Sequence, residues 1–291
     1  MTESGPIVVG YDGSTEAKLA VSWAANQALL RKRPLHLVHC SLWILVAPDL
    51  APVPGVADSG LERAAELVLQ EGRALAKDAA PALEVNTTLL HGLPRDHLAR
   101  MSADADMLVL GSRGIGGFMG LLIGSVSLEM AATASCPVAV IRSVEHPDGP
   151  VVVAIDDAGS PAALEDACAM AEAESATLKI VHVVHEPSGY RRLRDPVDAY
   201  PAAEALIDAA VLKARREAPH VEVSGQLLVD HSTPRAILEA AKDARIVVVG
   251  TKGHGLIKGT IGSTAHAVMH HAAGPVLVSR RSAEPPSATP R

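Results

Sequence analysis

The chain has 291 residues and a formal net charge of −7, with 33 acidic and 26 basic side chains. This length is ample for two domains, and the 48% share of hydrophobic residues supports sizeable cores built mainly from Val, Leu, Ile and Ala. Basic runs are absent and aromatic residues reach only 2%, so the sequence argues against non-specific nucleic-acid binding.

The cysteines and the N-terminus indicate the compartment. Cys40, Cys136 and Cys168 are odd in number and form no CxxC pair, which argues against a disulfide framework and fits a reducing environment. The first residues, MTESGPIVVG, lack the charged and apolar regions of a signal peptide, and no apolar run is long enough to span a bilayer. We therefore expect a soluble, cytoplasmic protein without a membrane span.

The sequence contains an internal repeat. IVVGYDGS at 7–14 is matched by VVVAIDDAGS at 151–160, LHLVHC by LKIVHV, MLVLGSRG by IVVVGTKG, and CPVAVIR by GPVLVSR. The offset between the paired segments stays nearly constant, as expected for a duplicated unit. We expect two homologous domains, 1–145 and 149–282, joined by the turn-forming HPDGP segment and followed by a Pro/Ser-rich tail, 283–291, that is disordered.

Within each half, short β-branched runs alternate with longer helical patterns. In the first half we expect strands at 7–11, 35–41, 84–90, 107–111 and 138–141, and helices at 15–31, 61–80, 94–103 and 126–134. The second half repeats this order and has the better helix start, with Ser160 as N-cap and Pro161 at the first helical position. The alternation predicts an α/β fold of two tandem doubly wound domains, each a five-stranded parallel sheet flanked by helices, packed as a pseudo-dimer.

A glycine-rich loop follows the fourth predicted strand. Six glycines fall between Gly111 and Gly124, and Ser125 stands where the next helix starts. In doubly wound sheets ligands bind beyond the carboxyl ends of the strands, so the loop lies on the ligand-binding edge. Glycine lets backbone amides approach a ligand and a helix N-terminus attracts negative charge, so the loop favours phosphate, with Arg113 available for a charge-assisted contact. A flexible loop without a ligand is the alternative.

The spacing excludes two familiar phosphate motifs. The first strand–helix turn, YDGST at 11–15, lacks GxGxxG, and the chain contains no GxxxxGK[ST]. Instead, GSRG is followed by nine residues and then by GS, and Asp12 closes the first strand. This pattern, together with the LVHCS and CPVAVIR segments, resembles the universal stress protein family over essentially the whole chain, as a tandem pair of family domains.

The resemblance implies what the site binds. In the ATP-binding branch of that family, the matching loop holds the phosphates and the ribose. The contacts carried over by this resemblance are Gly111, Gly114, Gly124 and Ser125, and the expected site also includes Arg113, for its charge, and Val126. Asp12 and Cys40 match positions at the adenine end, and Ser127 matches a hydroxyl beside the triphosphate. A purely turn-stabilising role of Asp12 before Ser14 stays open. The implied cofactors are ATP and Mg²⁺.

The second half keeps this pattern incompletely. Its corresponding positions are Asp156, Val183, Gly250, Gly253, Gly262 and Ser263. Eight residues rather than nine separate Gly253 from Gly262, and Lys252 replaces Arg113. A one-residue deletion in a tight loop is expected to re-aim its N–H groups. We still expect a second nucleotide site in this half.

Other side-chain constellations indicate no catalytic centre. His266 and His270 have the spacing of a metal pair, but neither HExxH nor a third ligand is evident, so we interpret them as helix-surface histidines. No serine lies in a GxSxG motif. Two irregular segments, 42–60 and 185–201, follow the second strand of each half and are either lids over the nucleotide or plain connections.

The resemblance implies an ATP-binding regulator of the stress response, and the residues add the expectation of no catalytic residue and at most slow ATP hydrolysis. Bound nucleotide is expected to order the glycine loops and to shift the conformation or the affinity for protein partners. The chain is expected to be a homodimer or a pseudo-dimeric monomer. Two alternatives stay open: an adenine-nucleotide hydrolase or transferase on the same fold, and a nucleotide-free module for protein interaction.

Overall fold

A computed structural model of the chain describes residues 5–41, 60–115, 122–185, 200–251 and 260–280. The first half contains strands β1 (Ile7–Gly10), β2 (Leu35–Ser41), β3 (Val85–His91), β4 (Met107–Gly111) and β5 (Val138–Ile141), with helices α1 (Thr15–Arg31), α3 (Gly60–Ala79), α4 (Pro94–Met101) and α5 (Ser125–Thr133). The second half contains β6 (Val151–Ile155), β7 (Leu178–His185), β8 (Val223–Asp230), β9 (Ile246–Gly250) and β10 (Val276–Ser279), with α6 (Pro161–Ala173), α8 (Pro201–Glu217), α9 (Thr233–Ala240) and α10 (Ser263–His271). None of the described helices is both long enough and apolar enough to cross a membrane.

The strands and helices predicted for the first half are confirmed, with ends that differ by at most two residues. One predicted helix start is wrong in its detail. Ser160 stands at the N-cap of α6, but its side chain makes no capping bond and its backbone is left-handed, with a φ of 42°. The turn before α6 instead uses the Ser160 hydroxyl to accept a hydrogen bond from Asp156 N at 3.0 Å. The better capped helix is α1, where Ser14 accepts a hydrogen bond from Ala17 N at 3.2 Å.

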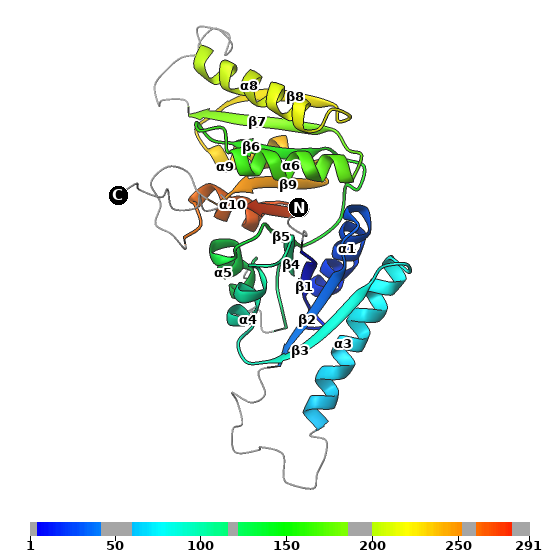
Figure 1. Cartoon of the computed structure of the whole chain (residues 1–291). Helices are drawn as coiled ribbons and strands as arrows, with labels where there is room; N and C mark the ends of the chain where they lie inside the picture. Colours follow the sequence, from blue (N-terminus) through cyan, green and yellow to red (C-terminus); the bar gives the residue numbers. More distant parts are fainter. Residues whose placement is uncertain (1–4, 42–59, 116–121, 186–199, 252–259, 281–291) are drawn as a thin grey trace, which may run out of the picture.

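All strands of the described ranges form one sheet, in the order β3-β2-β1-β4-β5-β10-β9-β6-β7-β8. Every pairing within a half is parallel, whereas β5 and β10 pair antiparallel, with Val140 opposite Val276. The prediction of two doubly wound five-stranded parallel sheets is therefore confirmed. The halves meet edge to edge, and Figure 1 shows β1–β5 on one side of this seam and β6–β9 on the other.

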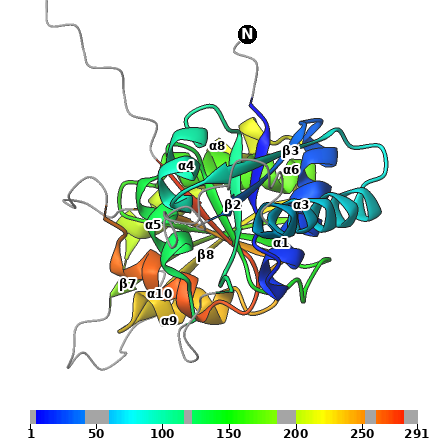
Figure 2. The same cartoon turned by 90° about the horizontal axis from the view of Figure 1, so that it is seen from below.

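Helices cover both faces of the sheet. One buried layer combines α1, α3, α6 and α8 with strand residues such as Val9 and Val153, and the other combines α4, α5, α9 and α10 with residues such as Val8 and Val152. Figure 2 shows α5, α9 and α10 on one side of the strands and α1, α3 and α6 on the other. Because both faces are covered, the strands are nearly continuous Val/Ile/Leu runs rather than alternating ones.

The strand order places the candidate site. The chain adds β2 and β3 on one side of β1 and then returns to add β4 on the other side, so strand order reverses between β1 and β4. The second half repeats this reversal between β6 and β9. Ligands of such sheets bind in the crevice at the carboxyl ends of the strands at this reversal, where the turn after β1 meets the end of β4.

Candidate functional site

The first-half site is built where β1 and β4 end side by side. Asp12 accepts a hydrogen bond from Ser14 N at its Oδ1 (3.0 Å) and another from Ile115 N at its Oδ2 (2.9 Å). The first bond is the Asx-type turn expected from the sequence, and the second ties the glycine loop to the β1–α1 turn. The Ser14 hydroxyl also donates to Arg113 O at 3.2 Å. These contacts tie the start of the glycine loop to the β1–α1 turn.

Two glycines of the loop lie where a side chain does not fit. A Cβ on Gly111 would come within 2.7 Å of the Glu16 backbone, in the first turn of α1. A Cβ on Gly114 would come within 2.3 Å of Asp12 Oδ2. At Gly124, by contrast, the nearest atoms to a Cβ would be 3.6 Å away, which is an ordinary contact. Packing of the fold therefore accounts for Gly111 and Gly114 but leaves Gly124 without a steric reason.

The N-terminus of α5 is open to an anion. Gly124 is its N-cap, with φ −75° and ψ 152°, and no side chain caps the helix. The Gly124 N–H donates to Ser112 O at 2.7 Å, which fixes the helix start against the end of β4. The amides of Ser125 and Val126 follow, and first-turn amides have no acceptor inside a helix. Ser125 is exposed, so these donors and the helix dipole favour an anion such as phosphate at this point.

Two of the predicted phosphate contacts already have partners within the chain. The Ser127 side chain is buried, and its hydroxyl donates to Gly111 O at 2.7 Å. This bond holds α5 against the end of β4, so the hydroxyl proton is not directed towards a triphosphate. Arg113 lies at the loop surface and pairs with Glu16, with 2.5 Å between Nη2 and Oε1. A phosphate group would have to displace Glu16 to gain this guanidinium.

Cys40 and Val183 occupy matching places near the carboxyl ends of β2 and β7. Both are half-buried and pack against the core layer that contains α5 and α10. Burial raises the pKa of the Cys40 thiol to about 11, so this thiol is neutral at physiological pH. These two positions therefore present small apolar surfaces on the same side of the sheet as the phosphate-facing helices.

His39 and His182, next to Cys40 and Val183, also belong to the candidate site, although the sequence analysis did not predict this. His39 Nδ1 donates to Tyr11 O at 2.7 Å, and His182 Nδ1 donates to Ile155 O at 3.0 Å. Each histidine thereby supports the strand end that immediately precedes Asp12 or Asp156. The signal was present in the repeat, because LVHC and IVHV carry the histidine at the same place.

The second half keeps the helix start but changes the turn. The Gly262 N–H donates to Thr251 O at 2.8 Å, and α10 begins with the same extended N-cap as α5, with φ −67° and ψ 150°. Ser263 at this helix start is exposed as Ser125 is, whereas most of the shortened loop, whose N–H groups are expected to be re-aimed, lies outside the described residues. Asp156 Oδ1 accepts hydrogen bonds from two amides of its own turn, Ala158 N and Ser160 N.

Part of the predicted site lies outside the described residues. Gly250 is described and ends β9, but Gly253 and Lys252 are not. The predicted lid segments also lie almost entirely outside the described ranges, as does the predicted tail 283–291.

Comparison with known proteins identifies the family. The family model described as the universal stress protein family matches the chain twice, over residues 4–142 and 149–280. The chain belongs to the universal stress protein family. A universal stress protein of Mycobacterium tuberculosis is 35% identical over 295 residues, covering 95% of this chain and 97% of the relative. Another from the same organism is 32% identical over 302 residues, covering 95% and 96%.

The fold is also shared with solved structures. A crystal structure of a universal stress protein from Archaeoglobus fulgidus has a TM-score of 0.67 and 22% identity, covering 96% of this chain and 97% of that one. The resemblance drawn from the glycine spacing, to a tandem pair of universal stress protein domains, is therefore confirmed.

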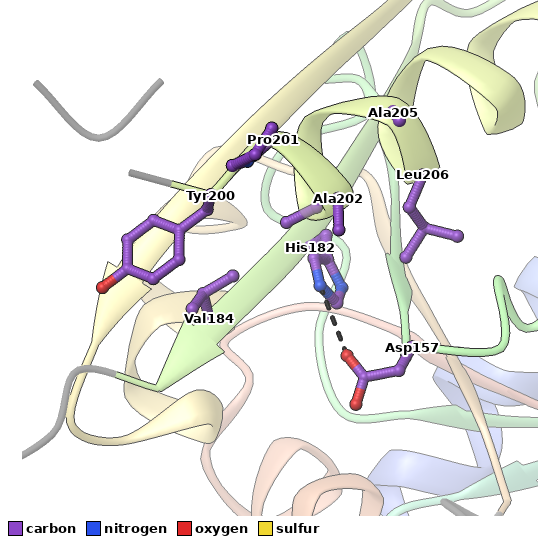
Figure 3. Close-up of a pocket in the computed structure, with 9 residues that line it drawn as sticks. Asp157, His182, Val184, Tyr200, Pro201, Ala202, Ala205 and Leu206 are labelled. Atoms are coloured by element: carbon purple, nitrogen blue, oxygen red, sulfur yellow. Dashed lines mark ion pairs between the residues drawn. The ribbon is translucent and has the colours of Figure 1, made fainter. Parts of the chain in front are cut away.

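This universal stress protein also contains a cavity of about 700 Å³ in its second half, whose lining does not include the N-termini of α5 and α10. Figure 3 shows it between the end of β7, the start of α8 and Asp157 in the β6–α6 turn. His182 is buried at one wall, with its Nε2 3.5 Å from Asp157 Oδ1. Because side chains alternate along a strand, His182 and Val184 face α8, whereas Val183 faces the layer of α10. The cavity thus lies on the opposite face of β7 from the expected phosphate site.

The histidine pair on α10 lies at the helix surface. The rings of His266 and His270 stack with centroids 4.4 Å apart. Within the described part of this universal stress protein, no group of three or more His, Cys, Asp or Glu side chains is arranged to hold a metal ion. Helix-surface histidines thus remain our interpretation.

Proposed function

We propose that this universal stress protein binds ATP at the carboxyl edge of its sheet, with the first-half site as the principal one. The observation that carries the proposal is the uncapped N-terminus of α5, set beside a loop that Asp12 ties to Ile115. A helix start with unpaired amides and a positive dipole end suits a multiply charged phosphate chain.

The residues present fit a triphosphate that carries adenosine. The amides of Ser125 and Val126 would donate to phosphate oxygens, and Arg113 would add charge by exchanging Glu16 for phosphate. The adenine would lie towards Cys40, whose neutral, half-buried thiol suits an apolar ring. The placement assigns polar contacts to the phosphates and apolar contacts to the base.

Mg²⁺ would accompany the nucleotide, held by phosphate oxygens and water rather than by a protein cage. Asp12 contacts the described start of the loop, and both of its oxygens already accept backbone hydrogen bonds. Its role is therefore to shape the loop, and the metal ion would neutralise phosphate charge.

We infer a regulatory role from the linkage between binding and conformation. A ligand that binds only the ordered loop stabilises that conformation, and any partner that recognises the conformation then binds more tightly. The Asp12 contacts disfavour rapid hydrolysis, because both of its oxygens accept backbone N–H groups. This carboxylate is therefore not free to activate a water molecule.

A nucleotide-free interaction module is the competing function. Such a module would pair the edges of its duplicated sheets. Within this chain, β5 and β10 form such a pair of edge strands. This pairing uses the two inner edges and leaves β3 and β8 as the outer edges of the described sheet.

The test places a negative charge at either helix start. Ser125→Glu and Ser263→Glu alter matched exposed positions, the first residues of α5 and α10. A carboxylate at a helix N-terminus stabilises the helix by about 0.3–1 kcal/mol, whereas it repels phosphate. Loss of binding without loss of thermal stability would therefore report on the site rather than on folding.

Titration calorimetry with ATP and Mg²⁺ supplies the readout. Two sites in the wild type, with one lost in each variant, would mean that both halves bind. Loss of all binding with Ser125→Glu alone would mean that the second half is structural. A folded wild-type protein that binds no ATP would overturn the proposal and leave the interaction module.

A further inference from the structure

Arg142, directly after β5, connects the glycine loop of the first half to a helix of the second half. Its Nη2 donates to Leu122 O at 3.0 Å and to Met269 O at 3.2 Å. Its Nη1 donates to His270 O at 2.9 Å and to Ala272 O at 3.1 Å. One guanidinium therefore joins four carbonyls that belong to two different halves of the chain.

The two groups of carbonyls lie on the segments that carry the two candidate sites. Leu122 lies two residues before Gly124, so its carbonyl sits next to the phosphate-facing start of α5. Met269, His270 and Ala272 form the C-terminal end of α10, whose other end is the candidate phosphate site at Ser263. Arg142 thus contacts the loop of one site and the far end of the helix that bears the other.

The chemistry of this junction makes it sensitive to movement. The last carbonyls of a helix have no partner inside it, and a cation there is favourable for both hydrogen bonding and the helix dipole. A guanidinium is planar with a fixed fork of donors, so a shift of the Leu122 carbonyl changes the geometry of the bonds to α10. Burial lowers the pKa of Arg142, the charge of Arg113 lowers it further, and the charge of Glu16 opposes this shift.

The matching arginine of the repeat offers a control. CPVAVIR aligns with GPVLVSR, so Arg280 is the counterpart of Arg142. The Nη1 atom of Arg280 is buried and has no hydrogen-bond partner in the described part of the chain. The four-carbonyl junction is therefore a feature of Arg142 that the repeat alone does not generate.

We propose that Arg142 transmits nucleotide binding at the first-half glycine loop to helix α10 of the second half. This inference rests on the proposed function, because it requires a nucleotide at the first-half loop. If ATP binding moves the Leu122 carbonyl, it changes the hydrogen bonds that Arg142 donates to the end of α10. By linkage, a change in the conformation of α10 alters the affinity of the first site for ATP by the same factor. The two halves then act as one regulatory unit, with Arg142 as a positioning residue rather than a ligand contact.

Hydrogen exchange with and without ATP and Mg²⁺ tests this coupling. In a Ser263→Glu background, which removes the expected site at the start of α10, ATP is expected to change the exchange rates of the amides in residues 267–272 by about fivefold or more, and the variants below are compared in this background. Arg142→Gln should abolish that change while calorimetry still detects ATP at the first site. Arg142→Lys keeps the positive charge but loses the planar set of guanidinium donors. It should therefore show a smaller ATP-dependent change in the exchange rates of α10. Arg280→Gln should leave the full response.

The outcomes separate the two proposals. If the Ser263→Glu variant binds ATP but α10 does not respond, or if Arg142→Gln still responds fully, the coupling is wrong and the binding site stands. If the wild type binds no ATP, the proposed function fails and the coupling fails with it. Should Arg142→Gln not fold, an Arg142→Lys response equal to that of the Ser263→Glu background would also overturn the coupling.

Discussion

The Asp12 carboxylate accepts the backbone N–H of Ile115 at 2.9 Å, across a sequence separation of 103 residues. This bond joins the first turn of the domain to the glycine loop that follows β4. It shows that the loop takes its shape from the fold as well as from any bound nucleotide. Asp12 is therefore a stability residue whose loss also disturbs the candidate site.

Replacing Asp12 by alanine should destabilise the folded protein and weaken ATP binding. The substitution removes the acceptor of two backbone N–H groups, at Ser14 and Ile115, which corresponds to about 1–3 kcal/mol in the free energy of unfolding. Urea denaturation and ATP titration measure the two effects. Asp157→Ala is the control, because its side chain is 91% exposed and should change stability by less than about 0.5 kcal/mol. Equal stability of the two variants would contradict the role assigned to the Asp12 clamp.

ATP should protect Cys40 from thiol reagents. Burial raises the thiol pKa of Cys40 to about 11 and those of Cys136 and Cys168 to about 12, so all three should react slowly in the folded protein. Cys40 is the least buried and should react first. Mass spectrometry after timed labelling, with and without ATP, identifies the modified residue. A Cys40 rate unchanged by saturating ATP would place the adenine elsewhere.

The fold could be predicted because its signals are local. Alternating strand and helix patterns, repeated twice, specify doubly wound sheets, and the strand reversal then places Asp12 and Gly111 at one edge. The long-range contacts could not be predicted in this way. The pairing of Arg113 with Glu16 spans 97 residues, and no local period encodes which helix the guanidinium meets.

The start of α6 shows the same limit on a smaller scale. Ser160 followed by Pro161 is a good capping sequence, yet the segment from Asp156 to Ser160 is two residues longer than the matching segment from Asp12 to Ser14. Those residues let the Ser160 hydroxyl meet Asp156 N instead of the first turn of the helix. The Ser160 hydroxyl could accept a hydrogen bond either from Asp156 N or from an amide in the first turn of α6. The geometry of the turn determines which bond forms, and residue preferences for the N-cap position do not predict that geometry.

Cutting the joint between the halves should not separate them. The β5–β10 ladder, the Arg142 junction and a bond from Ser143 Oγ to Ala273 O at 2.5 Å all cross the seam. A protease site inserted after Pro147, in an exposed turn, allows the chain to be cut after folding. Size-exclusion chromatography should then show one complex that separates only in denaturant. Separation of the halves under native conditions would mean that the linker, and not the seam, holds them together.

The contribution of Asp166 to the stability of the protein should fall as pH rises through the range in which its carboxyl titrates. Burial raises the pKa of this carboxyl from 3.8 to about 6, against the opposing effects of Ser279 and Arg31. Between these pH values the folded state keeps a proton that the unfolded chain has released, so folding is favoured at the acidic end and loses this contribution as pH rises. The shift corresponds to at most about 3 kcal/mol.

Asp166→Asn should accordingly raise the free energy of unfolding at pH 7.5 and lose that advantage at pH 4, as measured by urea denaturation at both pH values. Glu172→Gln, at an exposed site on the same helix, should change neither value. A lower stability of Asp166→Asn at pH 7.5 would show instead that the ionised carboxylate stabilises the fold through Arg31.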